Sequence, residues 1–472
     1  MEARLFIDGA WTSSERTTPV EHKYTAELLG EVHVASEEQV DRAVGALAAA
    51  HAAGPLHPYE RFEILSRASA LVEERRQELR DIIVAESGFT TKDADGEVTR
   101  AVQTLRLSGE EATRLNGEVV PLDGAPGVHH RMGYTVRHPL GVVAAITPFN
   151  SPLNTTCHKV GPALAAGNTV ALKPATYTPF TAAALVHILL DAGLPGDRIA
   201  LLQGGGGSVG QRLLEDPRIA FYTFTGSTEV GRHIQATVGL RGTQLELGSL
   251  SSTFVCADAD LERAVTASVS AAFRKAGQVC TSIQRLYVER GVYDEVLERL
   301  AANVASLGVG DPADPDTDVG PVISAGDAER IEAWVTAAEA RGATRVTGGD
   351  RQGRVIRPCL LTDVDPSLQV MCEEVFGPVM SVLPFDDLDA AVDEANDTPF
   401  GLSAGVFTND LPRAFRAAER LRMGSVHINQ TSSSRIDLMP YGGVKDSGYG
   451  HEGPRYAARE MSEEKLITIT HA

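Results

Sequence analysis

The stretch Gly141-Val-Val-Ala-Ala-Ile146 opens a regular alternation of short apolar runs and amphipathic segments, and this alternation decides the fold class. The apolar runs have the length and β-branched content of buried strands, whereas the segments between them carry apolar residues at helical spacing. Buried strands that alternate with helices predict a parallel sheet with right-handed crossovers. The alternation continues with expected strands at 168–173, 198–203 and 219–224 and expected helices at 178–192, 209–215 and 228–237.

The same rhythm begins again after Gly248, so the sequence predicts an α/β protein with two Rossmann-like parallel sheets. A chain of 472 residues is too long for one compact core and fits two or three packed units. Further helices are expected at 61–86, 98–115, 261–276 and 293–306, and a further strand at 285–288.

Two segments outside this rhythm predict a small β element. Residues 116–139 are polar and Gly-rich with alternating side chains, which indicates extended chain with little core of its own. Lys465-Leu-Ile-Thr-Ile-Thr470 is typical of a strand, and an exposed strand edge needs a cover. We expect a neighbouring subunit to supply that cover, with the 116–139 excursion as the candidate for pairing.

The composition excludes several classes of function. The content of 43% hydrophobic and 22% charged residues is typical of a globular protein, and the net charge of −20 argues against nucleic-acid binding. No apolar run approaches the roughly 20 residues that span a bilayer, and the first residues lack a secretory signal pattern. The five cysteines lie far apart without a CxxC pair, which favours reduced cytoplasmic thiols over disulfides or a metal site.

Three local patterns are candidates for contact with a dinucleotide. Gly205-Gly-Gly-Ser-Val-Gly210 fits G-x-G-x-x-G, but no acidic residue ends the next strand, so we interpret it as a close-packed turn. Phe224-Thr-Gly-Ser-Thr228 ends a strand and caps a helix, where free N–H groups favour an anion; an ordinary capped helix is the alternative. Lys173 ends a strand at the carboxyl edge, where ligands bind in such sheets; a solvated lysine is the alternative.

Three residues have the chemistry of a covalent catalyst. Cys280 follows the end of an expected helix in a Gly-containing loop, where a thiol can be exposed and activated. Glu246 lies inside an apolar run, and a buried carboxyl with a raised pKa suits a general base; a structural glutamate is the alternative. The proline-stiffened loop Thr147-Pro-Phe-Asn150 presents an amide that suits an oxyanion.

Together and in this order, these motifs resemble those of the aldehyde dehydrogenase superfamily over nearly the whole chain. Each motif is weak alone, and their joint occurrence at family order and spacing carries the resemblance. The similar pieces are Pro148-Phe-Asn150, Gly161-Pro-Ala-Leu-Ala-Ala-Gly-Asn168, Phe224-Thr-Gly-Ser-Thr-Glu229, Leu245-Glu-Leu-Gly248, Gly277-Gln-Val-Cys280, Glu373-Glu-Val-Phe-Gly-Pro378 and Pro440-Tyr-Gly-Gly-Val-Lys-Asp-Ser-Gly448.

The resemblance implies an organisation and an activity. It implies a homodimer or homotetramer that oxidises an aldehyde to a carboxylic acid with NAD or NADP, without a metal. The implied parts are a cofactor-binding domain of residues 1–115 and 137–247, a catalytic domain of 248–445, and an oligomerisation element of 116–136 and 446–472.

The resemblance also implies roles for single residues. Cys280 is the nucleophile, Asn150 and the Cys280 N–H hold the oxyanion, and Glu246 activates the water that hydrolyses the thioester. Lys173 and Glu374 contact the riboses, Ser227 contacts the pyrophosphate, and Phe376 lies beside the nicotinamide. The implied cofactor contacts are Thr147, Pro148, Phe149, Lys173, Thr176, Gly206, Gly226, Ser227, Leu247, Glu374 and Phe376.

Two departures from the family pattern bear on the base and the cofactor. Many relatives continue the motif around Glu246 with Gly-Lys, whereas this chain has Ser249 and Leu250, so backbone freedom near the base is reduced. Many NAD-specific relatives carry a glutamate three residues after the lysine, where this chain has Thr176. Because a hydroxyl does not repel a 2′-phosphate, we expect NADP to be accepted.

The substrate pocket departs from the pattern as well. At two positions that resemble aromatic wall residues of fatty-aldehyde and acetaldehyde oxidisers, this chain has Ser151 and His158. Arg435 lies in the loop 430–439, where relatives shape the substrate mouth. We expect a small polar or anionic aldehyde such as lactaldehyde, glyceraldehyde phosphate or a phosphono- or sulfo-acetaldehyde. His158, Ser151, Thr281 and Arg435 are the candidate contacts; a surface arginine and a loop-packing histidine are the alternatives.

Two rival functions share this pattern. A CoA-acylating dehydrogenase passes the acyl group to CoA, but such relatives usually lack the glutamate found here as Glu246. A structural protein recruited from the family, such as a lens crystallin, loses the nucleophile or the cofactor site. Cys280, Glu246, Asn150 and Lys173 are all present, which favours a hydrolytic enzyme.

Overall fold

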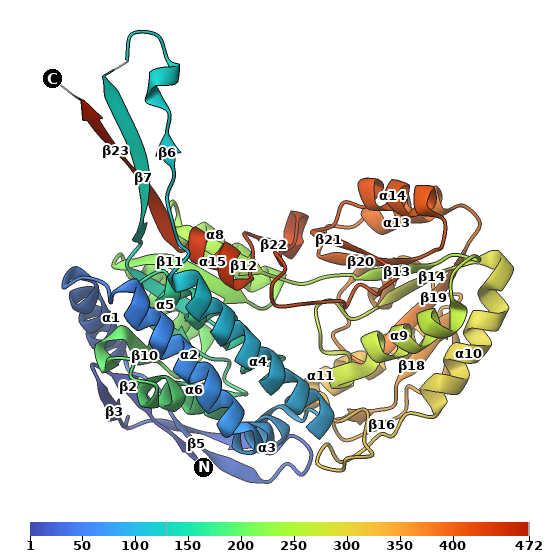
Figure 1. Ribbon diagram of the computed structural model, residues 1–472. Coiled ribbons are helices and arrows are strands. Elements are labelled where there is room, and N and C mark those ends of the chain that lie inside the picture. Colours follow the sequence, from blue (N-terminus) through green and yellow to red (C-terminus); the bar gives the residue numbers. More distant parts are fainter. Residues whose placement is uncertain (129, 471–472) are drawn as a thin grey trace.

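The computed structural model describes residues 1–128 and 130–470. Two lobes lie side by side, each built around one large sheet, and a narrow β arm extends away from the first lobe (Figure 1). Both large sheets are mixed but mostly parallel, and the other sheets are small. The predicted α/β architecture is therefore confirmed.

The sheet of the first lobe has eight strands in the order β22-β12-β11-β8-β9-β10-β2-β3. The strands from β12 to β10 are parallel, and antiparallel neighbours close both edges. The strands are β2 (Leu5–Ile7), β3 (Ala10–Thr12), β8 (Val142–Ile146), β9 (Thr169–Lys173), β10 (Ile199–Leu201), β11 (Ile219–Thr225), β12 (Gly242–Glu246) and β22 (Gly448–Tyr449).

Helices cover both faces of this sheet, which explains the continuous apolar run at β8. Val143 and Ala145 pack into a core cluster with α2, α4, α5 and α6, and Ala144 packs into another with α1, α7 and α8. All five residues of β8 are buried as a result. The helices are α1 (Glu37–Ala52), α2 (Pro58–Glu74), α3 (Arg76–Ser87), α4 (Thr91–Ala112), α5 (Asn154–Ala165), α6 (Pro179–Asp191), α7 (Gln211–Glu215) and α8 (Thr228–Val238).

The span 61–86, which the sequence predicts as one helix, is divided between α2 and α3. The two helices meet at Arg75, whose φ of −95° and ψ of 22° leave the helical region. The apolar spacing continues across this break because both helices bury one face against the same core. The prediction of helix was right, and the prediction of a single helix was wrong.

The sheet of the second lobe has seven strands in the order β15-β18-β19-β14-β13-β20-β21. Every neighbouring pair is parallel except β15 and β18. The strands are β13 (Ser252–Val255), β14 (Arg285–Glu289), β15 (Thr344–Thr347), β18 (Cys359–Thr362), β19 (Val379–Phe385), β20 (Ser403–Phe407) and β21 (Ser425–Ile428). The helices are α9 (Leu261–Phe273), α10 (Tyr293–Ala305), α11 (Ala325–Ala340), α12 (Gln369–Cys372), α13 (Leu388–Asn396) and α14 (Leu411–Arg420).

The helix expected at 261–276 ends one turn early, at Phe273. Lys275 and Ala276 have positive φ values of 52° and 53°, which a helix does not allow. The chain therefore turns sharply before it reaches Cys280, and the prediction of helix to residue 276 was wrong.

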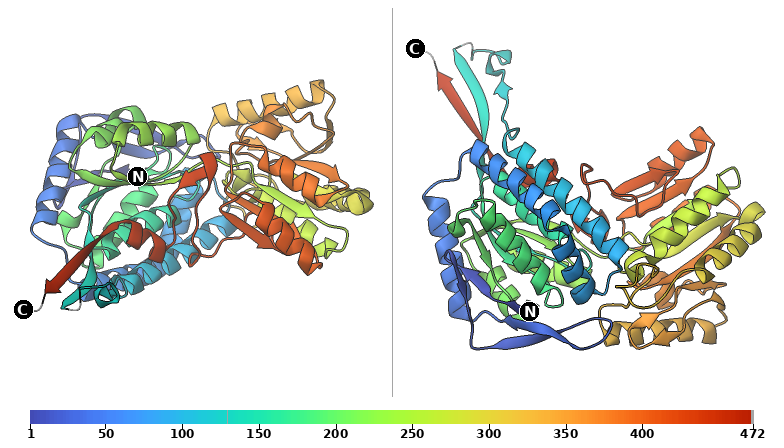
Figure 2. Two further views of the ribbon diagram at one scale, coloured as in Figure 1. Left: turned by 90° about the horizontal axis from the view of Figure 1, so that it is seen from above. Right: turned by 60° about the horizontal axis from the view of Figure 1, so that its bottom comes forward.

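The arm consists of β6 (Val119–Val120), β7 (Arg131–Pro139) and β23 (Ser462–Thr470), and it stands clear of both lobes in the right-hand view of Figure 2. We expected a neighbouring subunit to cover the last strand, but β23 pairs with β7 of its own chain along its whole length. The 116–139 segment therefore pairs with the last strand within one chain, whereas a neighbouring subunit at the other edge of β23 stays a prediction. In the sheet order β23-β7-β6, β23 keeps one free edge within the described chain.

The remaining elements are short. A small N-terminal sheet and a two-strand hairpin lie at the base of the molecule in Figure 1, and a short helix precedes the arm strand β23. Within residues 1–128 and 130–470, no helix is long and apolar enough to cross a membrane. These elements are β1 (Glu2–Ala3), β4 (Thr17–Glu21), β5 (Leu28–His33), β16 (Arg351–Gln352), β17 (Val355–Ile356) and α15 (Pro454–Glu460).

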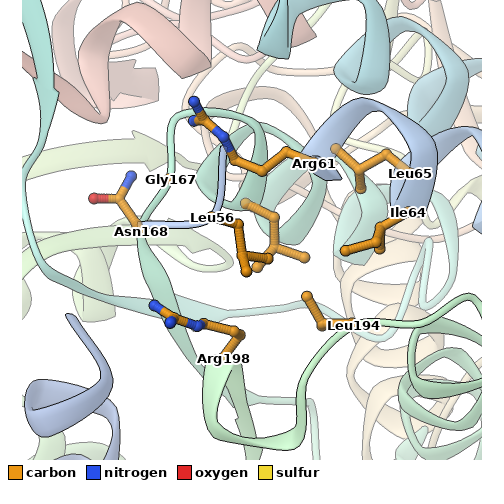
Figure 3. Close-up of a pocket in the computed structure, with 9 residues that line it drawn as sticks. Leu56, Arg61, Ile64, Leu65, Gly167, Asn168, Leu194 and Arg198 are labelled. Carbon is orange, nitrogen blue, oxygen red and sulfur yellow. The ribbon is translucent and has the colours of Figure 1, made fainter. Parts of the chain in front are cut away.

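A small cavity lies between α2 and the β9 side of the first lobe (Figure 3). Apolar side chains line it together with Arg61 and Arg198, whose guanidinium groups donate to main-chain oxygens of Ala165 and of Ala50 and Gly54. Its volume of about 10 Å³ holds at most one water molecule. It is a packing gap, and the functional residues lie elsewhere.

Candidate active site

One pocket between the lobes brings together the three residues expected to perform the chemistry. Glu246 ends β12, Asn150 lies in the loop after β8, and Cys280 lies in the loop after α9. Glu246 and Asn150 come from the carboxyl ends of β12 and β8, which lie on either side of β11 in one sheet, and Cys280 comes from the opposite lobe. The pocket is lined by Arg100, Asn150, Ser151, Thr155, Thr225, Glu246, Leu247, Arg274, Lys275, Val279, Cys280, Thr281, Arg435, Tyr441 and Glu452.

Cys280 is the one cysteine that lines this pocket. Its side chain is partly exposed, whereas three of the other cysteines are buried and Cys372 is on the surface. The Sγ atom lies 3.0 Å from the Tyr441 hydroxyl oxygen. Burial in the pocket raises the pKa of the Cys280 thiol to about 11, so the thiolate needs local stabilisation.

The loop that carries Cys280 is held in an unusual conformation. Lys275, Ala276 and Gly277 all have positive φ, and a Cβ on Gly277 would meet the main-chain oxygen of Gly377 at 2.1 Å. Only glycine fits against Gly377 at this point. The close approach of the two chains fixes the direction in which the loop leaves α9.

Hydrogen bonds to main-chain oxygens fix the loop on the other side of the nucleophile. The Ser251 hydroxyl donates to the Cys280 oxygen at 3.2 Å, and the Ser432 hydroxyl donates to the Thr281 oxygen at 2.9 Å. The main-chain N–H of Cys280 donates to no acceptor within the described residues. That N–H is therefore available to a ligand.

Asn150 is tied to the cysteine loop by its side chain. Its Nδ2 atom donates to the main-chain oxygen of Gln278 at 3.0 Å, which uses one of the two amide hydrogens. Its own main-chain oxygen accepts from the Lys275 ammonium at 2.9 Å. The second amide hydrogen and the Cys280 N–H remain as two donors in one pocket, which is the arrangement that an oxyanion needs.

Glu246 is buried with 2% of its surface exposed, and neither carboxylate oxygen has a hydrogen-bond partner within the described residues. Its strand is covered by β22, which lies inside the 446–472 segment expected in the oligomerisation element but pairs with β12. Burial and the charge of Glu452 raise the pKa of Glu246 well above its usual value. An unpartnered carboxyl with a raised pKa fits a general base better than a structural glutamate.

Glu452 lies beside this base and is itself ionised. Its carboxylate accepts from the Lys159 ammonium at 2.9 Å and from the Arg435 guanidinium at 2.7 Å. These two cations lower the pKa of Glu452 far below its usual value in spite of its burial. The result is a fixed negative charge next to Glu246.

The expected cofactor contacts gather at one edge of the first sheet. Lys173 is the last residue of β9, and Thr147, Gly226 and Leu247 directly follow the carboxyl ends of the neighbouring parallel strands β8, β11 and β12. Pro148 and Phe149 continue the loop from Thr147, and Ser227 caps α8 by accepting from the Val230 N–H. In parallel sheets of this kind, dinucleotides bind at the carboxyl ends of the strands and at the N-termini of the helices that follow them.

The buried Lys173 and the partly buried Glu374 fit ribose hydroxyls. Lys173 is 5% exposed, and in the described part of the chain its ammonium has a single hydrogen bond, to the Pro174 oxygen at 3.2 Å. Burial lowers the pKa of Lys173 to about 8. Glu374 accepts from the Ser249 N–H at 3.1 Å, and burial raises its pKa to about 7. Both side chains keep hydrogen-bonding capacity that a diol would use.

The remaining cofactor candidates surround the same edge. Phe376, at a positive φ of 47°, packs edge-on against Phe149 with ring centroids 5.8 Å apart. Thr176 is exposed in the turn after β9, and a Cβ built on Gly206 would have no atom within 4 Å. The turn at Gly206 therefore faces open space, as the approach of a ligand requires.

The expected substrate contacts are only partly brought together. Ser151, Thr281 and Arg435 line the pocket of Cys280. His158 does not line it: the ring is fully buried in α5 and lies 2.8 Å from the Asp437 carboxylate. The structure thus gives His158 a packing environment, the alternative weighed above, and Arg435 is engaged with Glu452.

Sequence reasoning missed several residues of the pocket, among them Glu452, whose charge lies beside Glu246. Arg100, Arg274, Lys275 and Tyr441 line it without having been singled out. Tyr441 lies in the motif Pro440-Tyr-Gly-Gly, and Arg274 and Lys275 lie just before Gly277-Gln-Val-Cys280, so nearness to a motif was the available signal. Arg100 comes from the middle of α4 and carried no signal.

Comparison with known proteins agrees with this geometry. The model of the aldehyde dehydrogenase family matches residues 11–467. The chain belongs to the aldehyde dehydrogenase family. This aldehyde dehydrogenase is therefore an NAD(P)-dependent oxidoreductase that converts an aldehyde to its acid.

Three relatives illustrate the similarity. The 3-sulfolactaldehyde dehydrogenase of Priestia aryabhattai is 44% identical over 98% of this chain and 97% of its own. The NADP-dependent glyceraldehyde-3-phosphate dehydrogenase of Bacillus halodurans, solved with NADP, is 35% identical with a TM-score of 0.97 and full coverage of both chains, 100% and 100%. Aldehyde dehydrogenase 21 of Physcomitrella patens, solved with the product succinate, is 36% identical with a TM-score of 0.96 over 99% of this chain and 98% of its own.

Proposed function

We propose that this aldehyde dehydrogenase oxidises a small aldehyde that carries an anionic group, and that it releases the acid by hydrolysis of a thioester on Cys280. The observation that carries the substrate class is the charge of the pocket. Cationic side chains line it from α4, from the cysteine loop and from the loop before β22. One of these cations has no carboxylate partner among the residues that the structure describes.

The pairing of the cations singles out Arg274. Among the pocket cations, Arg100 pairs with Asp437, Arg435 with Glu452 and Lys275 with Glu97. Within the described residues, Arg274 forms no ion pair, and its guanidinium donates to the Ser433 hydroxyl at 2.7 Å. A guanidinium with donors to spare in a partly buried pocket is suited to a carboxylate, phosphate or sulfonate.

Arg274 is also placed near the reacting sulfur. The Ser433 hydroxyl that it contacts lies 3.2 Å from the hydroxyl of Thr281, the residue that follows Cys280. A substrate whose anionic group is bound by Arg274 and whose aldehyde carbon lies at Cys280 would therefore have only a short carbon chain between these two groups. The named substrate of one relative, a sulfonated lactaldehyde, and the succinate bound by another support the same class.

The residues then divide the chemistry among them. The Cys280 thiolate attacks the aldehyde carbon, and the developing oxyanion accepts from the Asn150 amide and the Cys280 N–H, which stabilise it more than the ground state. NAD or NADP, when bound, would supply the acceptor for the hydride that leaves that carbon. Glu246 takes a proton from a water molecule, the water attacks the thioester carbon, and Cys280 leaves as the acid is released.

The residues at the cofactor edge also favour acceptance of NADP. Lys173 and Glu374 would hold the two riboses, and the exposed Thr176 presents a hydroxyl where a carboxylate would repel a 2′-phosphate. The relative of Bacillus halodurans was solved with NADP, which supports this part of the proposal.

The test is a panel of aldehydes of matched length that end in sulfonate, phosphonate, carboxylate or hydroxyl, assayed with both cofactors by the absorbance of the reduced nicotinamide. The anionic members should have the higher kcat/KM. In the Arg274→Met variant this preference should fall by about tenfold or more, since an interfacial charge pair is worth at least about 1.5 kcal/mol. The matched control is Arg106→Met, on the exposed face of α4.

Two outcomes would contradict the proposal. Equal kcat/KM for neutral and anionic aldehydes in the wild-type enzyme would remove the substrate class. A requirement for CoA, with the acyl group recovered as a CoA thioester, would replace hydrolysis by acyl transfer and remove the role of Glu246.

A further inference from the structure

The hydroxyl of Tyr441 lies 3.0 Å from the Cys280 sulfur, in the pocket that both residues line. Tyr441 is 7% exposed and follows Pro440 in the loop before β22. The phenolic oxygen has no other hydrogen-bond partner within the described residues. Its single proton therefore has the sulfur as its only protein acceptor.

The ring that carries this hydroxyl is firmly held. The Tyr441 backbone exchanges two hydrogen bonds with Glu452, of 3.0 and 2.7 Å. The Arg435 guanidinium lies over the ring, 3.8 Å from its centroid, and is itself held by the Glu452 carboxylate. A cation stacked on a phenol withdraws charge from the ring and makes the hydroxyl a stronger donor.

We propose that Tyr441 is a further catalytic residue, which donates a hydrogen bond to the Cys280 thiolate, and that Arg435 positions and polarises its ring. The thiol proton leaves the sulfur for a carboxylate or for water, and Tyr441 keeps its own proton throughout. When the sulfur attacks the aldehyde carbon, its charge passes to the carbonyl oxygen, and the bond from Tyr441 weakens accordingly.

The surroundings of the sulfur explain why such a donor is needed. Burial disfavours the thiolate, and so do two neighbouring carboxyl groups, whereas two guanidinium groups favour it without contacting the sulfur. Among the described residues, Tyr441 supplies the one direct hydrogen bond to the sulfur, and a hydrogen bond to the charged form of a group lowers its pKa. The facing groups are Glu246 from β12, Glu374 after α12, Arg274 after α9, and Arg435 and Tyr441 from the loop before β22.

The inference does not rest on the anionic substrate class, because it can be tested without any aldehyde. Iodoacetamide alkylation of Cys280 is followed between pH 6.5 and 9 in the cofactor-free enzyme, with the Cys280→Ser variant as the blank. A charge-assisted hydrogen bond lowers the thiol pKa by about one to two units, and about half of that gain is offset by weaker nucleophilicity. Tyr441→Phe should therefore be alkylated about three- to tenfold more slowly at every pH in this range.

The controls separate this role from a structural one. Tyr59→Phe removes the same oxygen from an exposed tyrosine of α2 and should be alkylated at the wild-type rate. Unchanged thermal unfolding and unchanged binding of reduced nicotinamide would show that the Tyr441→Phe site is intact. With any aldehyde substrate, kcat should fall at neutral pH and recover as the pH rises, while KM changes little.

The proposal would be overturned by alkylation of Tyr441→Phe at or above the wild-type rate. That result would mean that the thiol donates to the phenol and that Tyr441 holds the neutral resting form. A second result would also overturn the proposal, namely that the alkylation of Tyr441→Phe falls further behind the wild-type rate as the pH rises. A residue that donates a hydrogen bond to the thiolate speeds alkylation only while the thiol is not yet fully ionised, so the difference in rate should not grow with pH.

Discussion

The Lys275 ammonium lies 2.6 Å from the Glu97 carboxylate, buried where α4 meets the cysteine loop. Glu97 also accepts from the main-chain N–H groups of Leu153 and Asn154, and Lys275 also donates to the Asn150 oxygen. This ion pair thus joins three segments that must hold their relative positions during catalysis: α4, the Asn150 loop and the Cys280 loop.

The first prediction concerns this pair. Lys275→Met should lower the free energy of unfolding by about 3–5 kcal/mol, because it leaves Glu97 charged and buried without its partner. Denaturant unfolding measures this loss, and Lys92→Met on the exposed side of α4 is the matched control. A loss no larger than that of the control would show that the pair contributes nothing to stability.

The second prediction separates the two half-reactions. Glu246→Gln should still release about one reduced nicotinamide per active site in a rapid burst, and should then turn over about 10²–10⁴-fold more slowly, because water is no longer activated. Stopped-flow absorbance measures both phases, with Glu262→Gln on the surface of α9 as the control. Loss of the burst itself would place Glu246 in the acylation step instead.

The third prediction is the pH dependence of turnover. Burial and the Glu452 charge raise the pKa of Glu246, so a larger fraction of Glu246 is protonated and inactive as a base at low pH. Turnover should rise with pH through this raised pKa and be lost as the pH falls, and the burst amplitude should stay constant. A turnover rate that stayed flat or fell as the pH rose would contradict the assignment of Glu246 as the base.

The fourth prediction concerns the cofactor. Thr176→Glu should lower kcat/KM for NADP by about tenfold or more relative to NAD, because a carboxylate would face the 2′-phosphate. Thr176→Gln has nearly the same size without the charge and should change the ratio little. Comparable losses in both variants would mean that the position acts through its volume, and strict use of NAD by the wild-type enzyme would remove the idea altogether.

The fifth prediction concerns assembly through the arm. Leu466 and Ile469 are exposed apolar residues on β23, beside its free edge. Leu466→Glu should lower the mass measured by light scattering, because a charge would be buried in the interface expected there. Leu240→Glu, in an exposed turn of the first lobe, is the control and should leave the mass unchanged. A monomeric wild-type enzyme would contradict the expectation of a dimer or tetramer.

The parallel strands could be predicted from sequence because burial on both faces leaves a continuous apolar run, as at β8 and β9. The break at Arg75 could not, because the apolar spacing on both sides fits one helix. The left-handed turn at Lys275 could not be predicted either, because it accompanies a close contact between Gly277 and Gly377, which are far apart in the chain.

The site shows the same division. Cys280, Glu246 and Asn150 lie in recognisable motifs, and they line one pocket. The role of a side chain could not be predicted where it depends on partners that are distant in the sequence. His158 contacts Asp437, and Arg435 contacts Glu452 and the ring of Tyr441. Such partners are set by packing between the lobes, which leaves no local pattern in the sequence.

The pairing of β7 with β23 also has a consequence for how the protein is made. The ribosome adds about 5–20 residues per second, so β7 emerges tens of seconds before the strand that completes it. During that interval β7 is an unpaired edge on a partly folded chain, open to pairing with the wrong strand. The arm is therefore completed only after the ribosome has translated the chain through β23.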